Sequence, residues 1–535
     1  MMPTPLSLRF TSLSRVFYFA IGNWINDRVR VRQTLSLGLV YLTGLFAYQL
    51  FALILAEQSG VFFKLLKAQH GHPDLKDRIT LLLHLGMLSG AITWSIVLLR
   101  RGVTLNLVLK WSVLLSAVAI GGKIALVFYA GVLTPVQLAW SLAVARFWFG
   151  FGFSASLAIA LTLISERYPA YMRTWSATIV CAMGMLGPFL AIGLMTFLTE
   201  IAGAEFSPRV TGGLLFMAGL LLLMPLKLSF PKDAGRVDET EPVLAGAQAV
   251  RPVSFILGFV FRDKNTSRIF WACVAMGLSI SIFSDLMNML PRMIGRWELT
   301  LPSFFSLPDL AMIYLCRYTG MAIGTLYAGW ESDVKHSRKK IIYKLLWLQM
   351  LALFLLLSPT FSWMPKPDGW LYCAVIFFSG FVNGFWIILL LHTAEQFARP
   401  HRRIVNLLVL NLTRFGAFFI ILLNNFARPD WFNEFPAMLF FYGAAFISIG
   451  LFTAPFLPDN FGGNAVEPDY DTQTRFFDNQ QLRSEILRIP GETWLSEAPS
   501  PFLNEAKKIL FGHLSEKFRE NFYNTGLFFS QNGNR

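Results

Sequence analysis

Long apolar runs alternate with short polar segments along most of the chain, which is typical of a protein that crosses a membrane many times. A membrane-spanning helix needs about 20 mostly apolar residues, because it rises about 1.5 Å per residue across a hydrocarbon core about 30 Å thick. We therefore predict an all-α membrane protein with about twelve transmembrane helices. The predicted spans are 34–56, 79–99, 105–128, 135–163, 173–198, 211–229, 269–290, 308–329, 341–358, 369–393, 404–425 and 437–456.

One long polar segment, residues 230–268, divides these spans into six and six. We therefore predict two pseudo-symmetric six-helix bundles, 34–229 and 269–456, joined by a cytoplasmic linker. A basic N-terminal arm, residues 1–33, precedes the first bundle, and a polar tail, residues 457–535, follows the second.

The tail has the composition of a soluble segment. Apolar side chains recur at helical spacing from Pro501 to Phe522, with charges between them, and Ser500 followed by Pro501 is a typical helix start. An amphipathic helix on the cytoplasmic face accounts for this pattern. Docking of a protein partner on that helix is an alternative that the residues leave open.

Charged residues are scarce, which indicates that lipid is the main solvent. Only 15% of the residues are charged and 55% are hydrophobic, with a mean hydropathy of +0.52, whereas soluble domains are about 25% charged. The net charge of +14 could suggest a nucleic-acid partner, but Lys and Arg lie at the ends of apolar runs, in the N-terminal arm, the linker and the loops after spans 2, 8 and 10. The positive-inside bias then places both termini in the cytoplasm. We expect an integral multi-pass protein of the inner or plasma membrane, which contacts lipid and no nucleic acid.

The cysteines and the catalytic motifs give no sign of cofactor chemistry. Four cysteines stand singly inside apolar runs, so they indicate neither a disulfide framework nor a zinc site. The chain has no P-loop, no His-Glu-x-x-His, no nucleophile elbow and no paired acids and histidines near one membrane face. We therefore expect no cofactor, no metal and no enzymatic activity.

The two predicted bundles share a repeat. The segment from Ile164 to Arg173 ends span 4 and enters span 5, and the segment from Thr393 to Arg402 does the same for spans 10 and 11. Apolar composition does not place charged residues in register, so matches of this kind indicate two related halves. Three pairs have the same separation along the chain: Glu166 and Glu395, Arg173 and Arg402, and Gly187 and Gly416.

Two motifs carry a resemblance to a known family. Span 4 contains Arg146-x-x-x-Gly150-x-Gly152, and the loop after span 8 contains Gly329-x-x-x-Asp333 followed by a basic cluster. Together they resemble the major facilitator superfamily over residues 34–456, and the span 4 to span 5 region resembles metabolite:proton symporters and sugar porters most. The resemblance implies a secondary transporter with a central cavity lined by spans 1, 2, 4, 5, 7, 8, 10 and 11.

The sequence departs from the family pattern at two places. The loop after span 2, Leu98–Thr104, lacks the acidic residue of the family signature, and span 5 has only a fragment, Gly184–Pro188, of the Gly-Pro motif typical of antiporters. The first departure weakens the prediction of symmetric gating, and the second weakens an exporter interpretation.

Charged residues at the predicted cytoplasmic ends of the spans form a candidate gate. A carboxylate at the end of span 8 faces a helix N-terminus and cationic neighbours, and we expect the acid of span 10 to meet the basic cluster at 338–340 when this side is closed. Such pairs must separate for the protein to open, so they favour one state of the molecule. The alternative is an ordinary solvated loop. The candidate gating residues are Asp333, Arg338, Glu395, Arg402, Glu166 and Arg173.

Four charged residues lie deep in spans of the cavity-lining class. Arg146, Arg317 and Arg414 lie near the middle of spans 4, 8 and 11, and Asp285 lies in span 7 with Asn288 about one turn further on. A buried charge in a membrane is a functional candidate by default. Three cations and one acid leave a net positive centre, and a guanidinium matches a carboxylate with two parallel hydrogen bonds. We therefore predict an anionic substrate, with Asp285 as the proton carrier, although each arginine could instead satisfy a carbonyl or a structural pair.

Other polar residues of the spans are weaker candidates. Tyr48 and Gln49 of span 1, and Asn383 and Trp386 of span 10, are secondary candidates for lining the substrate site. Lys123, like Lys344, is placed close enough to a span end to extend its ammonium to the interface.

The first functional hypothesis is import of a small organic anion of the carboxylate type by alternating access, coupled to protons, by a monomer. The alternatives are efflux of drugs or metabolites, and a transporter-like receptor or scaffold whose tail binds a partner and which carries no flux.

Overall fold

The computed structural model describes the chain in segments: residues 28–56, 75–100, 103–168, 170–202, 208–227, 260–261, 264–297, 299, 301, 309–335, 337–360, 366–397, 399–426 and 435–458. These segments belong to one compact unit, Met1–Val466, and within them the regular structure is helical. The predicted tail helix at 501–522 lies outside the described residues, as does most of the predicted linker.

The first half of the chain supplies seven described α-helices, and a 3-10 turn follows them. They are α2 (Arg28–Ala56), α4 (Leu75–Leu98), α5 (Leu105–Tyr129), α6 (Pro135–Phe153), α7 (Ser156–Arg167), α8 (Ala170–Ala202) and α9 (Pro208–Leu223), with η1 (Met224–Lys227).

The second half supplies a matching set. It comprises α11 (Lys264–Trp297), α12 (Asp309–Lys335), α13 (Arg338–Leu356), η4 (Ser358–Thr360), α14 (Gly369–Val382), α15 (Phe385–Gln396), α16 (Arg399–Phe426), α17 (Phe435–Thr453) and η6 (Ala454–Phe456).

Each predicted span overlaps a described helix or an interrupted pair of helices. By length and hydropathy, these described segments can cross a membrane: Arg28–Ile54, Leu81–Leu98, Leu105–Tyr129, Val136–Arg167, Met172–Leu198 and Gly369–Gln396. Arg209–Leu223 and Phe440–Phe456 are shorter apolar helices. Helices α11, α12, α13 and α16 are less apolar because their sequences include more charged and polar residues.

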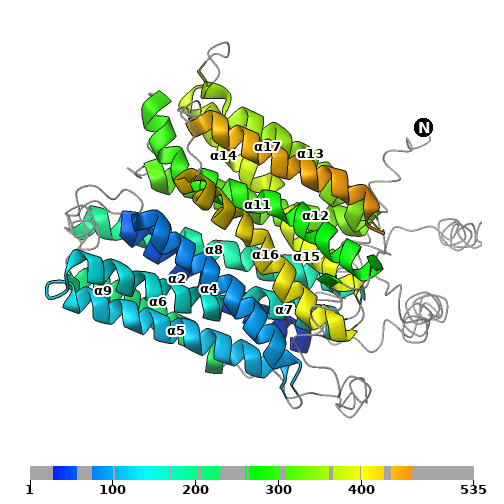
Figure 1. Cartoon of the computed structure of the whole chain (residues 1–535), viewed down its shortest axis with the longest axis horizontal. Coiled ribbons are helices and arrows are strands. Elements are labelled where there is room, and N and C mark those ends of the chain that lie inside the picture. Colours follow the sequence, from blue (N-terminus) through cyan, green and yellow to red (C-terminus); the bar gives the residue numbers. More distant parts are fainter. Residues whose placement is uncertain are drawn as a thin grey trace, which may run out of the picture. The chain divides into compact units, whose positions relative to one another are not determined.

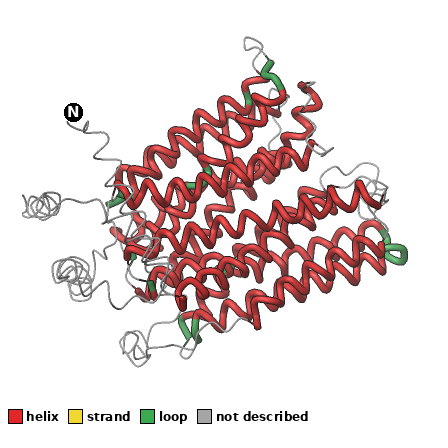
Figure 2. The backbone as a smooth tube through the Cα atoms, turned by 180° about the vertical axis from the view of Figure 1, so that it is seen from behind, coloured by secondary structure: helices red, strands yellow, loops and turns green. Residues whose placement is uncertain are grey.

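The helices pack as two groups (Figures 1 and 2). Helices α2 and α4 to α9 contact one another, and helices α11 to α17 contact one another. In Figure 1 the first group, blue to cyan, lies below the second, green to orange. The groups meet mainly where α8 packs on α12 and α4 packs on α16, with further contacts of α7 and α8 against α15 and α16.

The repeat seen in the sequence recurs in the backbone. Helix α6 ends at Phe153 and α7 begins at Ser156, while α14 ends at Val382 and α15 begins at Phe385. These two interruptions have the same separation along the chain as the repeated charged residues. The ends of α7 and α15 and the starts of α8 and α16 keep this separation too. The two halves therefore break and restart their helices at equivalent points.

The arginines of the repeat also make equivalent contacts. Arg173 donates from Nε to the carbonyl of Tyr168 at 2.8 Å, and Arg402 donates from Nε to the carbonyl of Phe397 at 3.3 Å. Each arginine thus binds a carbonyl at the end of the preceding helix and stabilises the turn into the next one.

Glycines allow the closest helix crossings. In α4, a Cβ at Gly86 or Gly90 would meet the carbonyl oxygens of Phe147 and Phe151 in α6. Gly320 and Gly324 of α12 face the carbonyl oxygens of Phe377 and Phe381 of α14 in the same way. Small residues four apart let two backbones touch, a common way to pack helices where lipid gives no hydrophobic driving force.

Candidate functional site

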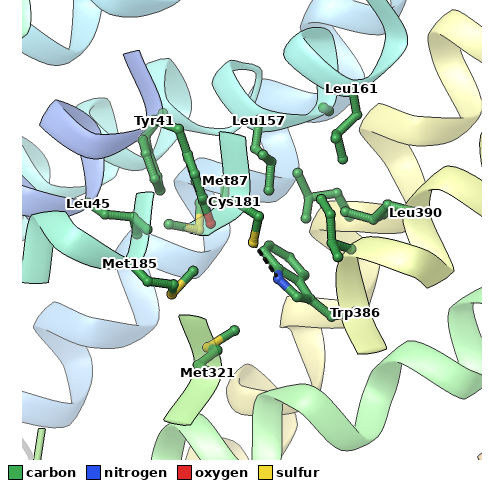
Figure 3. Packing of buried hydrophobic residues seen from close by; sticks show 14 of the residues in the cluster. Tyr41, Leu45, Met87, Leu157, Leu161, Cys181, Met185, Met321, Trp386 and Leu390 are labelled. Atoms are coloured by element: carbon green, nitrogen blue, oxygen red, sulfur yellow. Dashed lines mark hydrogen bonds between the residues drawn. The ribbon is translucent and has the colours of Figure 1, made fainter. Parts of the chain in front are cut away.

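The centre of the molecule is an aromatic and sulfur-rich core between the two helix groups. Figure 3 shows Tyr41, Met87, Cys181 and Trp386 facing one another, with contributions from α2, α4, α8 and α15. The indole Nε1 of Trp386 donates to the Cys181 sulfur at 3.3 Å. This contact joins the two halves of the chain near the predicted substrate site.

Arg414 of α16 lies in this core. Its guanidinium lies 5.6 Å from the ring centroid of Phe153 and 5.8 Å from that of Trp386, and its Nη1 lies 3.5 Å from the sulfur of Met87. It also forms a hydrogen bond with the hydroxyl of Tyr41. Aromatic faces and soft sulfur stabilise a cation without neutralising it, so this site retains its positive charge.

Arg146 of α6 is 5% exposed and lies 4.9 Å from the ring centroid of Phe51. Beside it, Lys123 of α5 is 1% exposed, with its ammonium 4.0 Å from the centroid of Phe51 and 4.3 Å from that of Phe149. The two cations therefore share one aromatic ring. The prediction that Lys123 reaches the interface is wrong, because its ammonium is enclosed by aromatic side chains.

Arg317 of α12 is 6% exposed and lies 5.9 Å from the ring centroid of its neighbour Tyr318. The Tyr318 hydroxyl donates to Oε1 of Gln49 at 3.0 Å, and Tyr314 also forms a hydrogen bond with Gln49. The amide Nε2 of Gln49 is buried and has no hydrogen-bond partner among the described residues. Gln49 of α2 thus joins the halves and keeps one donor available.

Two tyrosines each lie close enough to two of the arginines to interact with both. Tyr48 lies within interaction range of both Arg146 and Arg414, and Tyr314 lies within range of both Arg146 and Arg317. In the part of the chain that the structure describes, the ion pairs include neither Arg146 nor Arg414. The backbone of Asp285 and Asn288 lies in α11, but their side chains are outside the described set.

Three of the four secondary lining candidates lie near the arginines, and the fourth does not. Tyr48, Gln49 and Trp386 lie around the arginines, whereas Asn383 lies in the second helix group, where its Oδ1 accepts from Nε2 of Gln349 of α13 at 2.7 Å. Sequence reasoning missed Tyr41, Tyr314 and Tyr318. Their signal was available, since Tyr41 and Tyr48 are spaced to share one helix face and the other two tyrosines flank Arg317.

The candidate gate forms around Arg338, the first residue of α13. Its guanidinium is 1% exposed and forms a bidentate ion pair with Glu395 of α15, with Nη2 at 2.7 Å from Oε1. Nη1 donates to the hydroxyl of Thr174 in α8 at 3.1 Å and to that of Ser332 at 3.3 Å. Asp333 forms a hydrogen bond with the same threonine. One arginine of the second half therefore holds an acid of its own half and a helix of the other half.

A second gate contact is an ion pair between the halves. Arg403 of α16 donates from Nε and Nη2 to the carboxylate of Glu166 of α7, at 2.9 and 3.1 Å. Arg402 donates to the carbonyl of Ser165 at 3.4 Å. The acids of the repeat therefore bind Arg338 and Arg403, while its arginines bind the carbonyls at the helix ends.

Two asparagines of α16 extend these contacts toward the centre. Asn406 donates to the hydroxyl of Thr162 at 3.2 Å, and Asn411 donates to the carbonyl of Ser154 at 3.1 Å. Thr162 lies in α7, and Ser154 lies at the break between α6 and α7. The halves are therefore joined by polar contacts from the ends of α7 and α15 up to the central core.

The structure resembles solved transporters. It matches the proton:xylose symporter XylE bound to 6-bromo-6-deoxy-D-glucose with a TM-score of 0.61 and 15% identity, over 82% of this chain and 98% of that one. It matches the major facilitator superfamily transporter FucP in the outward conformation with a TM-score of 0.59 and 11% identity, over 81% and 100%. It matches a bacterial homologue of the iron transporter ferroportin, in an outward-facing state, with a TM-score of 0.58 and 14% identity, over 80% and 99%.

No family model matches the sequence, and no curated protein is detectably similar to it. The structural likeness nevertheless covers almost the full length of the known transporters. The chain has the fold of the major facilitator superfamily, and the prediction of an all-α, multi-pass membrane protein of this fold is confirmed.

Proposed function

We propose that this protein is a secondary transporter that moves a small organic anion of the carboxylate type across the membrane by alternating access. The observation that carries the proposal is the central cluster of Arg146, Arg317 and Arg414. Tyr48 lies within interaction range of Arg146 and Arg414, and Tyr314 lies within range of Arg146 and Arg317. Buried charges in a membrane normally have partners, and a guanidinium binds a carboxylate with two parallel hydrogen bonds. A bound anion would supply the negative charge for Arg146 and Arg414, which form no ion pair within the part of the chain that the structure describes.

The polar contacts between the halves support the alternating part of the proposal. The gate around Arg338 and the ion pair between Arg403 and Glu166 lie at the predicted cytoplasmic ends of the helices. The Arg403–Glu166 pair is partly exposed on its arginine side, and such pairs contribute little to stability and change easily between states. The Arg338–Glu395 pair is buried within the second half, so the contact of Arg338 that joins the halves is its hydrogen bond to Thr174. In this proposal the contacts between the halves hold the cytoplasmic side closed, and they separate when the site opens inward.

Coupling to protons is the second part of the proposal. The known transporters that this chain resembles include two described as proton symporters, for xylose and for fucose. Asp285, whose backbone lies in α11, is our candidate for carrying the coupled proton. Protonation of that acid would leave the cluster more positive and so favour binding of the anion.

Uptake into proteoliposomes tests both parts. We expect saturable uptake of at least one radiolabelled mono-, di- or tricarboxylate, stimulated by an inward proton gradient. Arg146→Gln and Arg414→Gln should each reduce uptake by about tenfold or more, because each removes a charge-assisted anion contact. Arg100→Gln, an exposed arginine just after the end of α4, is the matched control and should leave uptake unchanged.

Asp285→Asn separates coupling from binding. We expect this variant to retain exchange of the anion but to lose its accumulation against a gradient. If well-folded wild-type protein carries no carboxylate in any of these assays, the anion proposal is wrong.

A further inference from the structure

Lys123 is a buried basic side chain that the cluster of three arginines does not include. Its ammonium lies between the rings of Phe51 and Phe149, and it shares the Phe51 ring with Arg146. Aromatic faces compensate only part of the lost hydration of a buried ammonium, and two cations that share a ring repel each other strongly in a low dielectric. An anion close to Lys123 and Arg146 would keep both groups charged.

Gln49 adds an uncharged donor on the Arg146 side of this group, through Tyr314. Its oxygen accepts from Tyr318, and Tyr314, which also binds Gln49, lies within interaction range of Arg146. This fixes the amide so that its Nε2, which has no hydrogen-bond partner among the described residues, faces away from the tyrosine that binds its oxygen. Lys123, Arg146 and Gln49 thus present donors without a described acid, and we call this group the outer subsite.

Arg414 with Tyr41 forms a separate group, the inner subsite, at a different depth. The depth of a residue is its distance along its helix from the predicted cytoplasmic end. At about 1.5 Å per residue, Lys123 lies about 27 Å from the start of α5, and Arg146 lies about 32 Å from the end of α7. On the same scale, Arg414 lies about 22 Å from the start of α16. The two subsites are therefore roughly 5 to 10 Å apart along the helices.

We propose that the outer and inner subsites bind two separate anionic groups of one substrate, which is a short linear dicarboxylate. This inference rests on the proposed function, because it assigns the anion class at the same central site. A single carboxylate could satisfy only one of the two levels and would leave the other with buried cations. A single phosphate group would also place its charge at one level.

Matched ligands test the inference on the wild-type protein. In proteoliposomes, succinate uptake is competed with unlabelled succinate, monomethyl succinate, butyrate and inorganic phosphate. We expect succinate to compete about tenfold more strongly than its half ester, because the ester removes one charge and adds only one methyl group. Equal competition by the half ester, or stronger competition by phosphate, would contradict the two-level site and leave anion transport intact. Transport of no carboxylate would instead contradict the proposed function itself.

A pair of variants tests the outer subsite directly. Lys123→Met keeps a long apolar side chain and removes the charge, and we expect it to weaken succinate about tenfold while the half ester changes by less than about twofold. Lys110→Met, an exposed lysine of the same helix, is the matched control. Equal losses for both ligands, in protein with an unchanged thermal midpoint, would contradict the assignment of Lys123 to the second anionic group.

Gln49→Glu gives a second and independent variant. It replaces the amide nitrogen of Gln49 with an oxygen and adds a negative charge on the Arg146 side of the outer subsite. We expect the preference for succinate over its half ester to fall from about tenfold to near equality, since one substrate carboxylate is now replaced by the protein's own. An unchanged preference would overturn the assignment of Gln49 and Arg146 to a second anion subsite.

Discussion

Asp333 shows how one residue at the gate can respond to pH. It lies at the end of α12, beyond the apolar span predicted at 308–329, beside Arg338, Glu395 and Thr174. Burial raises the pKa of the Asp333 carboxyl to about 6, and the guanidinium of Arg338 opposes this shift. The protonated acid is therefore favoured in the closed gate relative to water.

The sign of this shift gives a prediction for stability. An acid whose pKa is raised on folding stabilises the folded protein below its unfolded pKa, and that contribution is lost as the pH rises through about 6. We expect the thermal midpoint of the wild type to fall by about 2 °C more than that of Asp333→Asn between pH 5 and pH 7. Thermal unfolding in detergent, followed by tryptophan fluorescence, measures both proteins. Parallel curves for the two proteins would show that Asp333 is not the titrating group.

At the same scale, the sequence identified some site residues and missed others for a physical reason. Arg146, Arg317 and Arg414 were identified because a charge inside an apolar run is rare and expensive. Tyr41 and Tyr318 look like ordinary apolar positions, and only the crossing of helices brings them to the arginines. Lys123 was assigned to an interface because it lies near the end of a predicted span. The rings that enclose its ammonium come from other helices, so the sequence alone does not reveal them.

At the scale of helices, α12 and α14 can cross closely because glycines of α12 place no side chain between the two backbones. A Cβ at Gly324 would meet the backbone of Phe381, including its carbonyl oxygen, which cannot move aside as a flexible side chain could. The sequence predicted both helices, but the length of an apolar run does not reveal which glycines lie at a crossing. The breaks at 154–155 and 383–384 were likewise absent from the predicted spans, because no proline marks them.

We expect Gly324→Ala to destabilise the protein by about 1 to 3 kcal/mol, since the added methyl group forces the two backbones apart. Gly121→Ala in α5 is the control, because a Cβ there has no neighbour within 4 Å. Its helix should be unchanged or slightly more stable. Thermal midpoints in detergent compare the two variants with the wild type. A Gly324→Ala midpoint equal to the wild-type value would contradict close packing at this crossing.

At the scale of the whole transmembrane unit, symmetry and asymmetry have different origins in the sequence. The repeat in charged positions predicted equivalent turns, and the backbone breaks at 153–156 and 382–385 follow the same spacing. The partners of the repeated acids do not follow it, because Glu395 binds Arg338 within the second half while Glu166 binds Arg403 across the halves. Such pairings depend on the conformation of the molecule, which a repeat in one sequence does not specify.

Movement of one half against the other, as in the proposed transport cycle, can be tested where Asn406 meets Thr162. These side chains are 3.2 Å apart, with one in each half. In Thr162→Cys/Asn406→Cys, a short, membrane-permeable bis-methanethiosulfonate reagent should form a disulfide with each thiol, link α7 to α16 and stop transport. Reduction of the disulfides should restore transport. The wild type treated with the same reagent measures any contribution of the native cysteines, of which Cys181, Cys273 and Cys373 are buried and Cys316 is half-buried.

The matched control places the same link inside one half. Gln349 and Asn383 are 2.7 Å apart in α13 and at the end of α14, so Gln349→Cys/Asn383→Cys joins two helices of the second group. We expect that link to form and to leave most of the transport intact, because helices within a group move together when the halves rock. Full transport after complete linkage of α7 to α16 would mean that this contact does not open during the cycle. Equal loss in both linked proteins would show that the helices of the second group also rearrange during transport.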